Sequence, residues 1–388
     1  MTNIAPNFDI LINNKPLSQK ARINIQSLQL VESITNTAKV QFIISDYDGF
    51  DLNLYTPQLK NSIHVKMGYG NELSSMFEGE IVNINPIYSS KETSTLEIIA
   101  MDRSYLLKKK QIPMMYSGNK FPNILSIIKY IVNKYNDPIQ LRLFVSPEST
   151  LRNYTLTDDQ AIEQTSETDW QMLDKIRKIG NYRLFVYSRT LSMVDTTWLL
   201  NNQSIKYTFE HRPTQQKVAS GLVIPLKSFK PSLGVQDQRE KVSIIWWKAV
   251  TKNNTSELKT DTVDTEGDIG YVDIRFGTSG FNTNLETIRV KENVKNDSQA
   301  KAIVEAELQS RAEKIVQGEG TIQGNPHLRI GQKHKFILND IPGINRQYSG
   351  DYHITEVSHT YTLKEGYVTG FKVRRSGLST MLITSREQ

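Results

Sequence analysis

Short runs that alternate hydrophobic and polar residues dominate the first hundred positions. Between Phe8 and Leu107 these runs read ARINIQSLQLVESI, KVQFIISD, SIHVKMGYG and TLEIIAMD, and turn-forming stretches such as SDYDGFD and YGNELS separate them. A period of two is typical of strands that bury one face, and several short strands between turns are typical of a barrel or sandwich. The pattern predicts a first β-barrel domain over residues 1–112.

The next part of the chain changes to a helical period. In FPNILSIIKYIVNKY, residues 121–135, apolar side chains recur at helical spacing and Pro122 suits a first helical turn. A second helix is predicted over 168–179, where Thr168 and Gln171 have capping-box spacing, and the following YRLFVYS has strand character. We therefore predict an α+β domain over 113–203, with helices near 122–135 and 168–179.

Strand-like patterns return for most of the remaining chain. They predict a second β-barrel from residues 204–234 and 318–375, divided by an insertion over 235–317. The insertion combines strands, a long polar loop and a helix over 297–316, and residues 376–388 form a C-terminal tail. We interpret the glycines of GEGTIQG as a helix stop and a turn. The fold class is thus mainly β with α+β insertions: two similar antiparallel β-barrel domains plus a mixed α/β domain.

Two hairpin-like stretches echo each other. Residues 78–104 and 349–376 both open with a glycine, Gly79 or Gly350, and continue with Ile or Val at alternate positions. Each first strand ends in Tyr, a Lys-Glu turn follows, and an Arg-Ser pair closes the second strand. Coincidence between two ordinary hairpins is one explanation. The other is that the chain carries two copies of one barrel, so that a trimer would present six similar barrels in a ring.

Composition narrows the chemistry. The 388 residues are 38% hydrophobic and 23% charged, the mean hydropathy is -0.44, and cysteine is absent, which excludes disulfides and cysteine-ligated metals. The net charge of +6 is spread along the chain, and we interpret its densest cluster, 108–110, as a solvated turn rather than a basic patch. No run approaches about 18 consecutive apolar residues, so we expect no stable membrane insertion.

Motifs for catalysis or cofactor binding are absent from the sequence. It contains no P-loop, no HExxH, no GxSxG and no EF-hand loop. His353 and His359 would lie roughly 20 Å apart along a strand, too far to share a metal. The carboxylates near the second helix, Asp158 to Asp169, are better explained by the helix N-terminus than by an acid/base pair. We predict no catalytic residue, no metal site and no cofactor.

Three segments resemble the phage baseplate hub proteins, a family that includes late-control D-type tail proteins, the hub of contractile-tailed phages and the N-terminal part of type VI secretion spike proteins. They are MFEGEIVNINPIYSSKETSTLEIIAMDRSYLL, QTSETDWQMLDKIRKIGNYRLFVY, and the stretch from DSQAKAIVEAELQSRAE through GNPHLRIGQKHKFILND to SGDYHITEVSHTYTLKEGYVTGFKVRR. Their order and spacing over most of the chain make the resemblance specific.

The resemblance implies a structural, non-enzymatic hub subunit. It would form a homotrimeric ring with pseudo-sixfold symmetry, a symmetry adaptor that connects the tail tube, or a tube-initiator protein, to a trimeric spike carried on a separate chain. Other baseplate proteins would contact it, and DNA or cargo would only pass through its polar lumen. The expected location is the virion tail baseplate of a contractile injection system, after tail assembly in the host cytoplasm.

Barrel edge strands are the candidate inter-subunit contacts, since exposed backbone groups can pair between subunits. We place them around residues 81–88 and 352–361, with the candidate residues Ile81, Ile84, Tyr88, Tyr352, Ile354, Val357 and Tyr361. An alternative function is a tail adsorption module that binds a cell-surface carbohydrate. A third is a glycan hydrolase on a β scaffold, which would need convergent carboxylates.

Overall fold

The computed structural model describes most of the chain outside the predicted insertion. The described residues are 5–45, 57–90, 93–111, 113–135, 140–146, 151, 155–156, 161–179, 182–187, 189–196, 198–199, 203–219, 223–234, 242–245, 288–291, 310, 313–339 and 348–375. The predicted tail 376–388 and most of the predicted helix 297–316 lie outside them. Val316, the last residue of that helix prediction, begins a strand instead.

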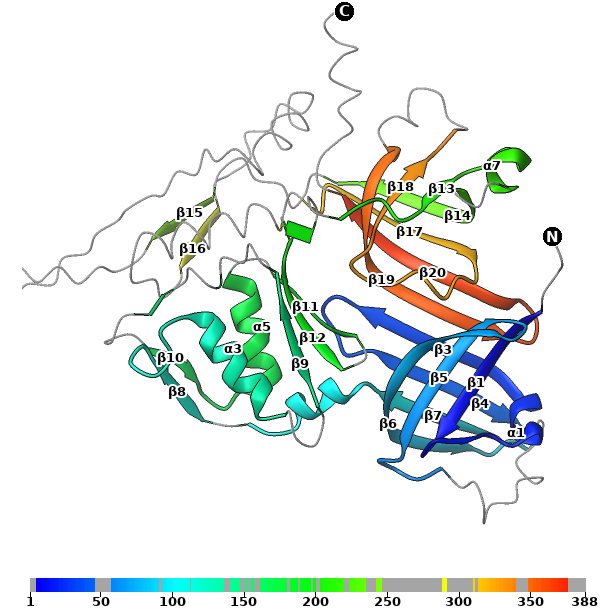
Figure 1. Ribbon diagram of the computed structural model, residues 1–388, viewed down its shortest axis with the longest axis horizontal. Coiled ribbons are helices and arrows are strands. Elements are labelled where there is room, and N and C mark those ends of the chain that lie inside the picture. The colour runs from blue at the N-terminus through cyan, green and yellow to red at the C-terminus, as the bar shows by residue number, and fades with distance from the viewer. Residues whose placement is uncertain are drawn as a thin grey trace, which may run out of the picture.

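The first unit is a curled antiparallel sheet (Figure 1, blue to cyan). It contains β1 (Pro6–Ile12), β2 (Lys15–Pro16), α1 (Gln19–Ile23), β3 (Ile25–Ser33), β4 (Lys39–Ser45), β5 (Ser62–Tyr69), β6 (Glu72–Ile87) and β7 (Thr95–Met101). A 3₁₀ helix, η2 (Arg103–Lys108), follows. Its strand order is β3-β4-β7-β6-β5-β1-β2, and no ladder between described residues joins β1 back to β3.

The second unit is a closed barrel (Figure 1, green and orange to red). It consists of β13 (Thr208–Glu210), β14 (Val223–Leu233), β17 (Val316–Gln323), β18 (Lys333–Ile337), β19 (Gly350–Thr362) and β20 (Gly366–Arg375), with the short α7 (Gln215–Ala219). The barrel closes because β18 pairs with both β13 and β19. The β13–β14 and β13–β18 ladders are parallel, so this barrel is not antiparallel throughout as predicted.

Between the two units the chain forms an α/β domain. It contains β8 (Met114–Ser117), α3 (Ile124–Asn133), β9 (Arg142–Val145), β10 (Ala161–Gln164), α5 (Asp169–Ile179), β11 (Tyr182–Tyr187) and β12 (Thr190–Asp195). The strands form a β11-β12-β9 sheet and a β8-β10 pair. Both helices lie where helical spacing predicts them. Within the predicted insertion, β15 (Val242–Ile245) pairs in parallel with β16 (Ile288–Lys291).

One ladder joins the two β units into a single sheet. Residues 27–33 of β3 pair antiparallel with 356–362 of β19, which makes a continuous order β14-β17-β20-β19-β3-β4-β7-β6. All seven ladders between these eight strands are antiparallel. The β19–β3 ladder divides the sheet into two four-stranded halves, β14-β17-β20-β19 and β3-β4-β7-β6. The two echoing hairpins, β6–β7 and β19–β20, occupy corresponding places in the halves.

Three apolar cores stabilise this mainly β architecture, which confirms the predicted fold class. The first lies inside the curled sheet and includes Leu28, Phe42 and Ile98, and the second fills the closed barrel with Phe209, Phe336 and Phe371. The third surrounds α3 and α5 and contains Trp170, as the helix pattern leads one to expect. In the part of the chain that the structure describes, no helix is long and apolar enough to cross a membrane.

Glycines allow close strand contacts at a few positions. A Cβ on Gly79 would lie 2.8 Å from the Met101 carbonyl carbon on the neighbouring strand and 2.6 Å from the Phe77 ring. Gly350 has φ of 151°, a region that only glycine adopts readily. Gly318 and Gly320 lie in β17 beneath the Phe229 ring, so the interpretation of these glycines as a helix stop and turn is wrong.

We expect Gly79→Ala to lower the free energy of unfolding by about 1–3 kcal/mol, because the new methyl group would force β6 away from β7. The matched control is Gly234→Ala, where nothing lies within 4 Å of the added Cβ. Urea unfolding followed by circular dichroism measures both. Equal stability of the two variants would show that β6 can shift without cost.

Candidate functional site

The continuous eight-stranded sheet has one apolar face and one mixed, mainly polar face. Side chains such as Leu30, Val40 and Ile98 face the cores, so their neighbours along each strand face outward. Directly paired residues share a face, and the registers place Lys230, Glu319, Lys372 and Glu356 in one row across four strands. Charges alternate along this row, and Lys372 forms a 2.7 Å ion pair with Glu356.

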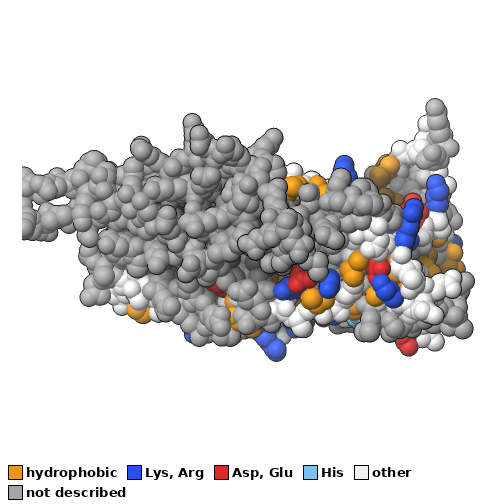
Figure 2. All heavy atoms as spheres, turned by 90° about the horizontal axis from the view of Figure 1, so that it is seen from above, with side chains coloured by type: hydrophobic (Ala, Val, Ile, Leu, Met, Phe, Trp, Pro, Cys, Tyr) orange, Lys and Arg blue, Asp and Glu red, His pale blue; other side chains and the backbone are white. Residues whose placement is uncertain are grey.

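Other outward residues continue this polar face. Ser228 and Thr321 hydroxyls lie 2.7 Å apart, and in the other half Glu97 accepts hydrogen bonds from Gln41 at 2.5 Å and Asn85 at 2.7 Å. Figure 2 shows another side of the molecule, where basic and acidic side chains of the described residues alternate with small apolar areas. The described residues in this view form no extended patch of one charge.

The two outer strands of this eight-stranded run, β6 and β14, each contain a segment that is paired on one side only. In β6, residues 83–87 pair with β7, whereas β5 pairs only as far as Glu80. In β14, residues 226–233 pair with β17, whereas β13 pairs only with 223–225. Pro86 and Pro231 lie in these segments, and proline is tolerated in a sheet chiefly at edges. Within the described residues, no other strand pairs with these two open edges.

The seven residues predicted at subunit contacts fall into two different environments. On β6, Ile81 is buried, Ile84 is partly buried, and Tyr88 just beyond the strand is 84% exposed. On β19, Tyr352, Ile354 and Val357 are buried and Tyr361 is partly buried. Because β3 and β18 pair with the far side of β19, that strand has no open edge. Sequence reasoning missed β14, whose prolines and lysines were the available signal for an edge strand.

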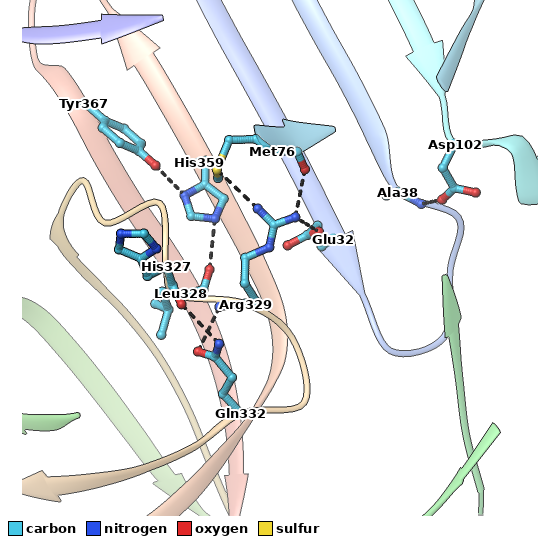
Figure 3. Close-up of polar contacts among 10 residues, drawn as sticks. All are labelled: Glu32, Ala38, Met76, Asp102, His327, Leu328, Arg329, Gln332, His359 and Tyr367. Carbon is cyan, nitrogen blue, oxygen red and sulfur yellow. Dashed lines mark hydrogen bonds and ion pairs between the residues drawn. The ribbon is translucent and has the colours of Figure 1, made fainter. Parts of the chain in front are cut away.

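A polar junction connects the two β units, as Figure 3 shows, and also contacts the α/β domain. Arg329, from the loop before β18, donates 2.7 Å hydrogen bonds to Glu32 on β3 and to the Met76 carbonyl oxygen on β6. Its guanidinium also lies 4.6 Å from the ring centre of Tyr187 on β11. One largely buried cation therefore contacts three parts of the fold, which no local sequence pattern indicates.

A buried histidine orders the loop that carries Arg329. His359 Nε2 lies 3.1 Å from the Leu328 carbonyl oxygen, and Tyr367 Oη lies 2.8 Å from His359 Nδ1 (Figure 3). Because a carbonyl only accepts, Nε2 carries the proton and Tyr367 donates to Nδ1. Burial lowers the pKa of His359 to about 3, so the ring is neutral. This histidine therefore has a structural role.

Two buried carboxyl groups lie near the junction. Burial raises the pKa of Glu32 to about 7, although the Arg329 guanidinium opposes the shift. Burial also raises the pKa of Asp102 to about 6, against the hydrogen bonds that Ser104 and Ala38 donate to it. Asp102 caps η2 at the end of β7 and so fixes the path into the α/β domain.

The acidic cluster near the second helix does not converge in the described residues. Asp169 is buried and receives hydrogen bonds from Tyr135 at 2.9 Å and Gln164 at 3.0 Å, with Lys134 at 3.3 Å. Asp158 and Asp159 lie outside the described residues. Among the residues that the structure describes, no group of three or more His, Asp or Glu side chains could hold a metal ion. These contacts at the start of α5 explain why the Asp169 carboxylate is buried.

We expect Glu32→Gln to remove part of the pH dependence of stability. With the folded-state pKa raised above the ordinary 4.5, the folded protein holds this proton while the unfolded chain releases it, so stability falls as pH rises toward 7. Relative to Glu32→Gln, the wild type should lose about 1 kcal/mol between pH 6 and 7.5. Urea unfolding at both pH values measures this difference.

The wild type must be compared with the Glu32→Gln variant because other buried groups also make the stability depend on pH. Asp102 acts in the same direction between about pH 4 and 6. The buried histidines His334, His353 and His359, whose pKa values are lowered, act in the opposite direction, but equally in both proteins. A difference that does not change with pH would contradict the raised pKa of Glu32.

We expect Arg329→Met to cost about 1–3 kcal/mol at pH 8, because the Glu32 carboxylate loses its cation and the Met76 carbonyl oxygen loses a hydrogen-bond donor. Adding Glu32→Gln to this variant should restore part of the loss, since no carboxylate then lies buried beside the missing cation. A double-mutant cycle by urea unfolding gives the coupling. Strictly additive effects would mean that the pair does not interact.

Comparisons with known proteins identify the fold. No protein-family model matches the sequence, and no curated protein matches it. Among solved structures, the 43 kDa tail protein of prophage MuSo2 from Shewanella oneidensis is similar at a TM-score of 0.67 and 12% identity, covering 96% of this chain and 98% of that one. A tail protein from Neisseria meningitidis MC58 is similar at a TM-score of 0.64 and 12% identity, with the same coverage.

A third similar structure comes from a secretion system. The Escherichia coli c3393 protein, described as a component of the type VI secretion system with structural similarity to bacteriophage T4 tail proteins, matches at a TM-score of 0.51 and 12% identity, covering 96% of this chain and 77% of that one. The resemblance seen in the sequence thus agrees with the architecture. The chain has the fold shared by these phage tail and type VI secretion proteins.

Proposed function

We propose that the protein is a structural hub subunit of a phage-tail-like baseplate, which closes into a homotrimeric ring through the open edges of β6 and β14. The observation that carries the proposal is the run of eight antiparallel strands, whose two outer strands, β6 and β14, each contain a segment that is paired on one side only. The fold shared with tail proteins supports the setting. A structural subunit needs no catalytic group.

The ladder between β19 and β3 is a template for the contact between subunits. β19 and β6 end corresponding halves of the sheet, and β3 and β14 begin them. Within one chain, β19 pairs with β3 through residues 356–362 and 27–33. If β6 of one subunit pairs with β14 of the next in the same manner, three chains present six equivalent halves. A trimer then has pseudo-sixfold symmetry on one face.

Strand direction also favours closure. The seven ladders are all antiparallel, and eight strands therefore place β14 and β6 in opposite directions. Joining β6 to a neighbour's β14 continues the antiparallel alternation without an interruption. Pro86 and Pro231 withhold N–H groups, and Lys227 and Lys230 add charge, which disfavours indiscriminate edge pairing.

The polar face suits the lumen of such a ring. Its alternating row from Lys230 to Glu356 has no net charge, so it would neither bind nor strongly repel a passing polyanion. Small residues, Ser228, Gly370 and Ser358, occupy the adjacent row. The cores then lie on the outside of the lumen wall. The ring would connect a tail tube or tube-initiator protein to a trimeric spike, with other baseplate proteins around it.

This assignment predicts a trimer that depends on the β6 edge. Light scattering should show three copies of the wild-type chain per particle, either alone or in a complex with a trimeric spike protein. Ile87→Asp with Tyr88→Asp should reduce it to a monomer, because both exposed side chains extend the open edge. Ile23→Asp is the control, since Ile23 is also exposed but lies on α1. A wild type that stays monomeric under both conditions would contradict the ring.

Engineered disulfides locate the contact, because the chain has no cysteine of its own. Asn85→Cys on β6 is combined in turn with Ser228→Cys, Lys230→Cys or Ser232→Cys on β14. At one register, oxidation should link chains up to a covalent trimer and no further on a non-reducing gel. Val31→Cys with Ser358→Cys, directly paired within one chain, should give an intrachain link only. Linkage beyond three chains would indicate an open filament.

A further inference from the structure

The α/β domain contains a groove that does not belong to the eight-stranded sheet. Its volume is about 590 Å³, and it runs between α3 and β9. Leu125 and Val132 contribute from the helix, and Leu143 and Val145 contribute from the strand. The exposed Phe144, 6.3 Å from the Trp198 ring, adds apolar surface at the strand. The groove is therefore largely apolar.

One side of the groove is an open sheet edge. β9 is the last strand of the β11-β12-β9 sheet, and among the described residues it pairs only with β12. The Arg142 amide donates to the Arg189 carbonyl oxygen on the β12 side. Because amide directions alternate along a strand, the backbone groups of Leu143 and Val145 point to the open side. An added strand beside β9 would satisfy them.

The rim of the groove is basic. Lys129 on α3 and Arg142 on β9 both line it and are exposed, and none of its lining residues is acidic. Neither side chain forms an ion pair with a described residue, unlike Lys134 on the same helix, which pairs with Asp169. Two uncompensated cations flank an apolar groove, which favours an occupant that is apolar and negatively charged.

We propose that this groove binds an extended acidic segment of another protein, which adds to the sheet as a strand beside β9. Backbone hydrogen bonds to Leu143 and Val145 set the direction and register of the added strand. Apolar side chains at alternate positions enter the groove against Leu125 and Val132, and acidic side chains reach Lys129 and Arg142. This is the strand-addition mode of peptide recognition. It would tether a partner to the α/β domain and leave the ring edges free.

A displayed random-peptide library provides the first test. It is selected on the intact wild type and counter-selected on Lys129→Glu with Arg142→Glu, whose fold is checked by thermal unfolding. We expect enriched peptides that alternate apolar with acidic residues. Enrichment of peptides without acidic residues, or no enrichment over the counter-selected protein, would overturn the proposal.

The best peptide, fluorescein-labelled, is then measured by anisotropy. The double charge reversal should weaken binding by about tenfold or more, whereas Lys20→Glu, an exposed lysine on α1, should not change it. Hydrogen exchange of residues 141–146 should slow on binding, because an added strand protects the open amides. Unchanged exchange would rule out strand addition.

Other occupants give different results. Tighter binding of a labelled single-stranded oligonucleotide that needs the same two cations would make this a nucleic-acid site and overturn the proposal. Self-association that the charge reversal abolishes would make the occupant a second copy of the chain, with the same consequence. Both tests are independent of the β6 and β14 edges, so a failed ring would leave them interpretable.

Discussion

The ladder between β3 and β19 is the constraint on which the rest of the structure depends. It pairs residues more than 300 positions apart in the chain and turns a curled sheet and a closed barrel into one surface. Forming it orders a very long loop, whose entropic cost grows only slowly with length. The hydrogen bonds of the ladder and the packing of Tyr361 and Tyr367 against the first core offset that cost. This single contact fixes how the two halves of the sheet are placed and directed relative to each other.

The polar junction holds the third part of the fold in place. Arg329 joins β3, the β6 backbone and the Tyr187 ring in a buried position. A buried ion pair is weak evidence of net stability, since desolvation of both charges opposes their attraction. Its clear effect is geometric, because the guanidinium contacts groups from both β units and the α/β domain at once. The raised pKa of Glu32 reflects the same desolvation.

The two faces of the eight-stranded sheet differ in their surroundings, because one packs on the cores and the other faces outward. The inward positions of β3, β4 and β7 are apolar except for Glu32, and the outward positions carry Gln, Ser, Lys and Glu beside the partly exposed Val31, Ile43 and Ile99. Because side chains alternate along a strand, each segment contributes to both faces at once. Alternating charge between neighbouring strands, as in Lys372 and Glu356, keeps the outer face hydrated without a strong net field.

The sequence by itself determined the local structure. Period-two runs located β3, β4, β5 and β7, helical spacing located α3 and α5, and two hairpins showed similar local patterns, because these signals depend only on residues near one another in the chain. The tertiary structure decided what depends on distant residues. It placed β19 against β3, so that β14 became the open edge, assigned Gly318 and Gly320 to a strand, and brought Arg329 to Glu32. Burial at such contacts comes from segments far apart in the chain, and no local pattern encodes which of them meet.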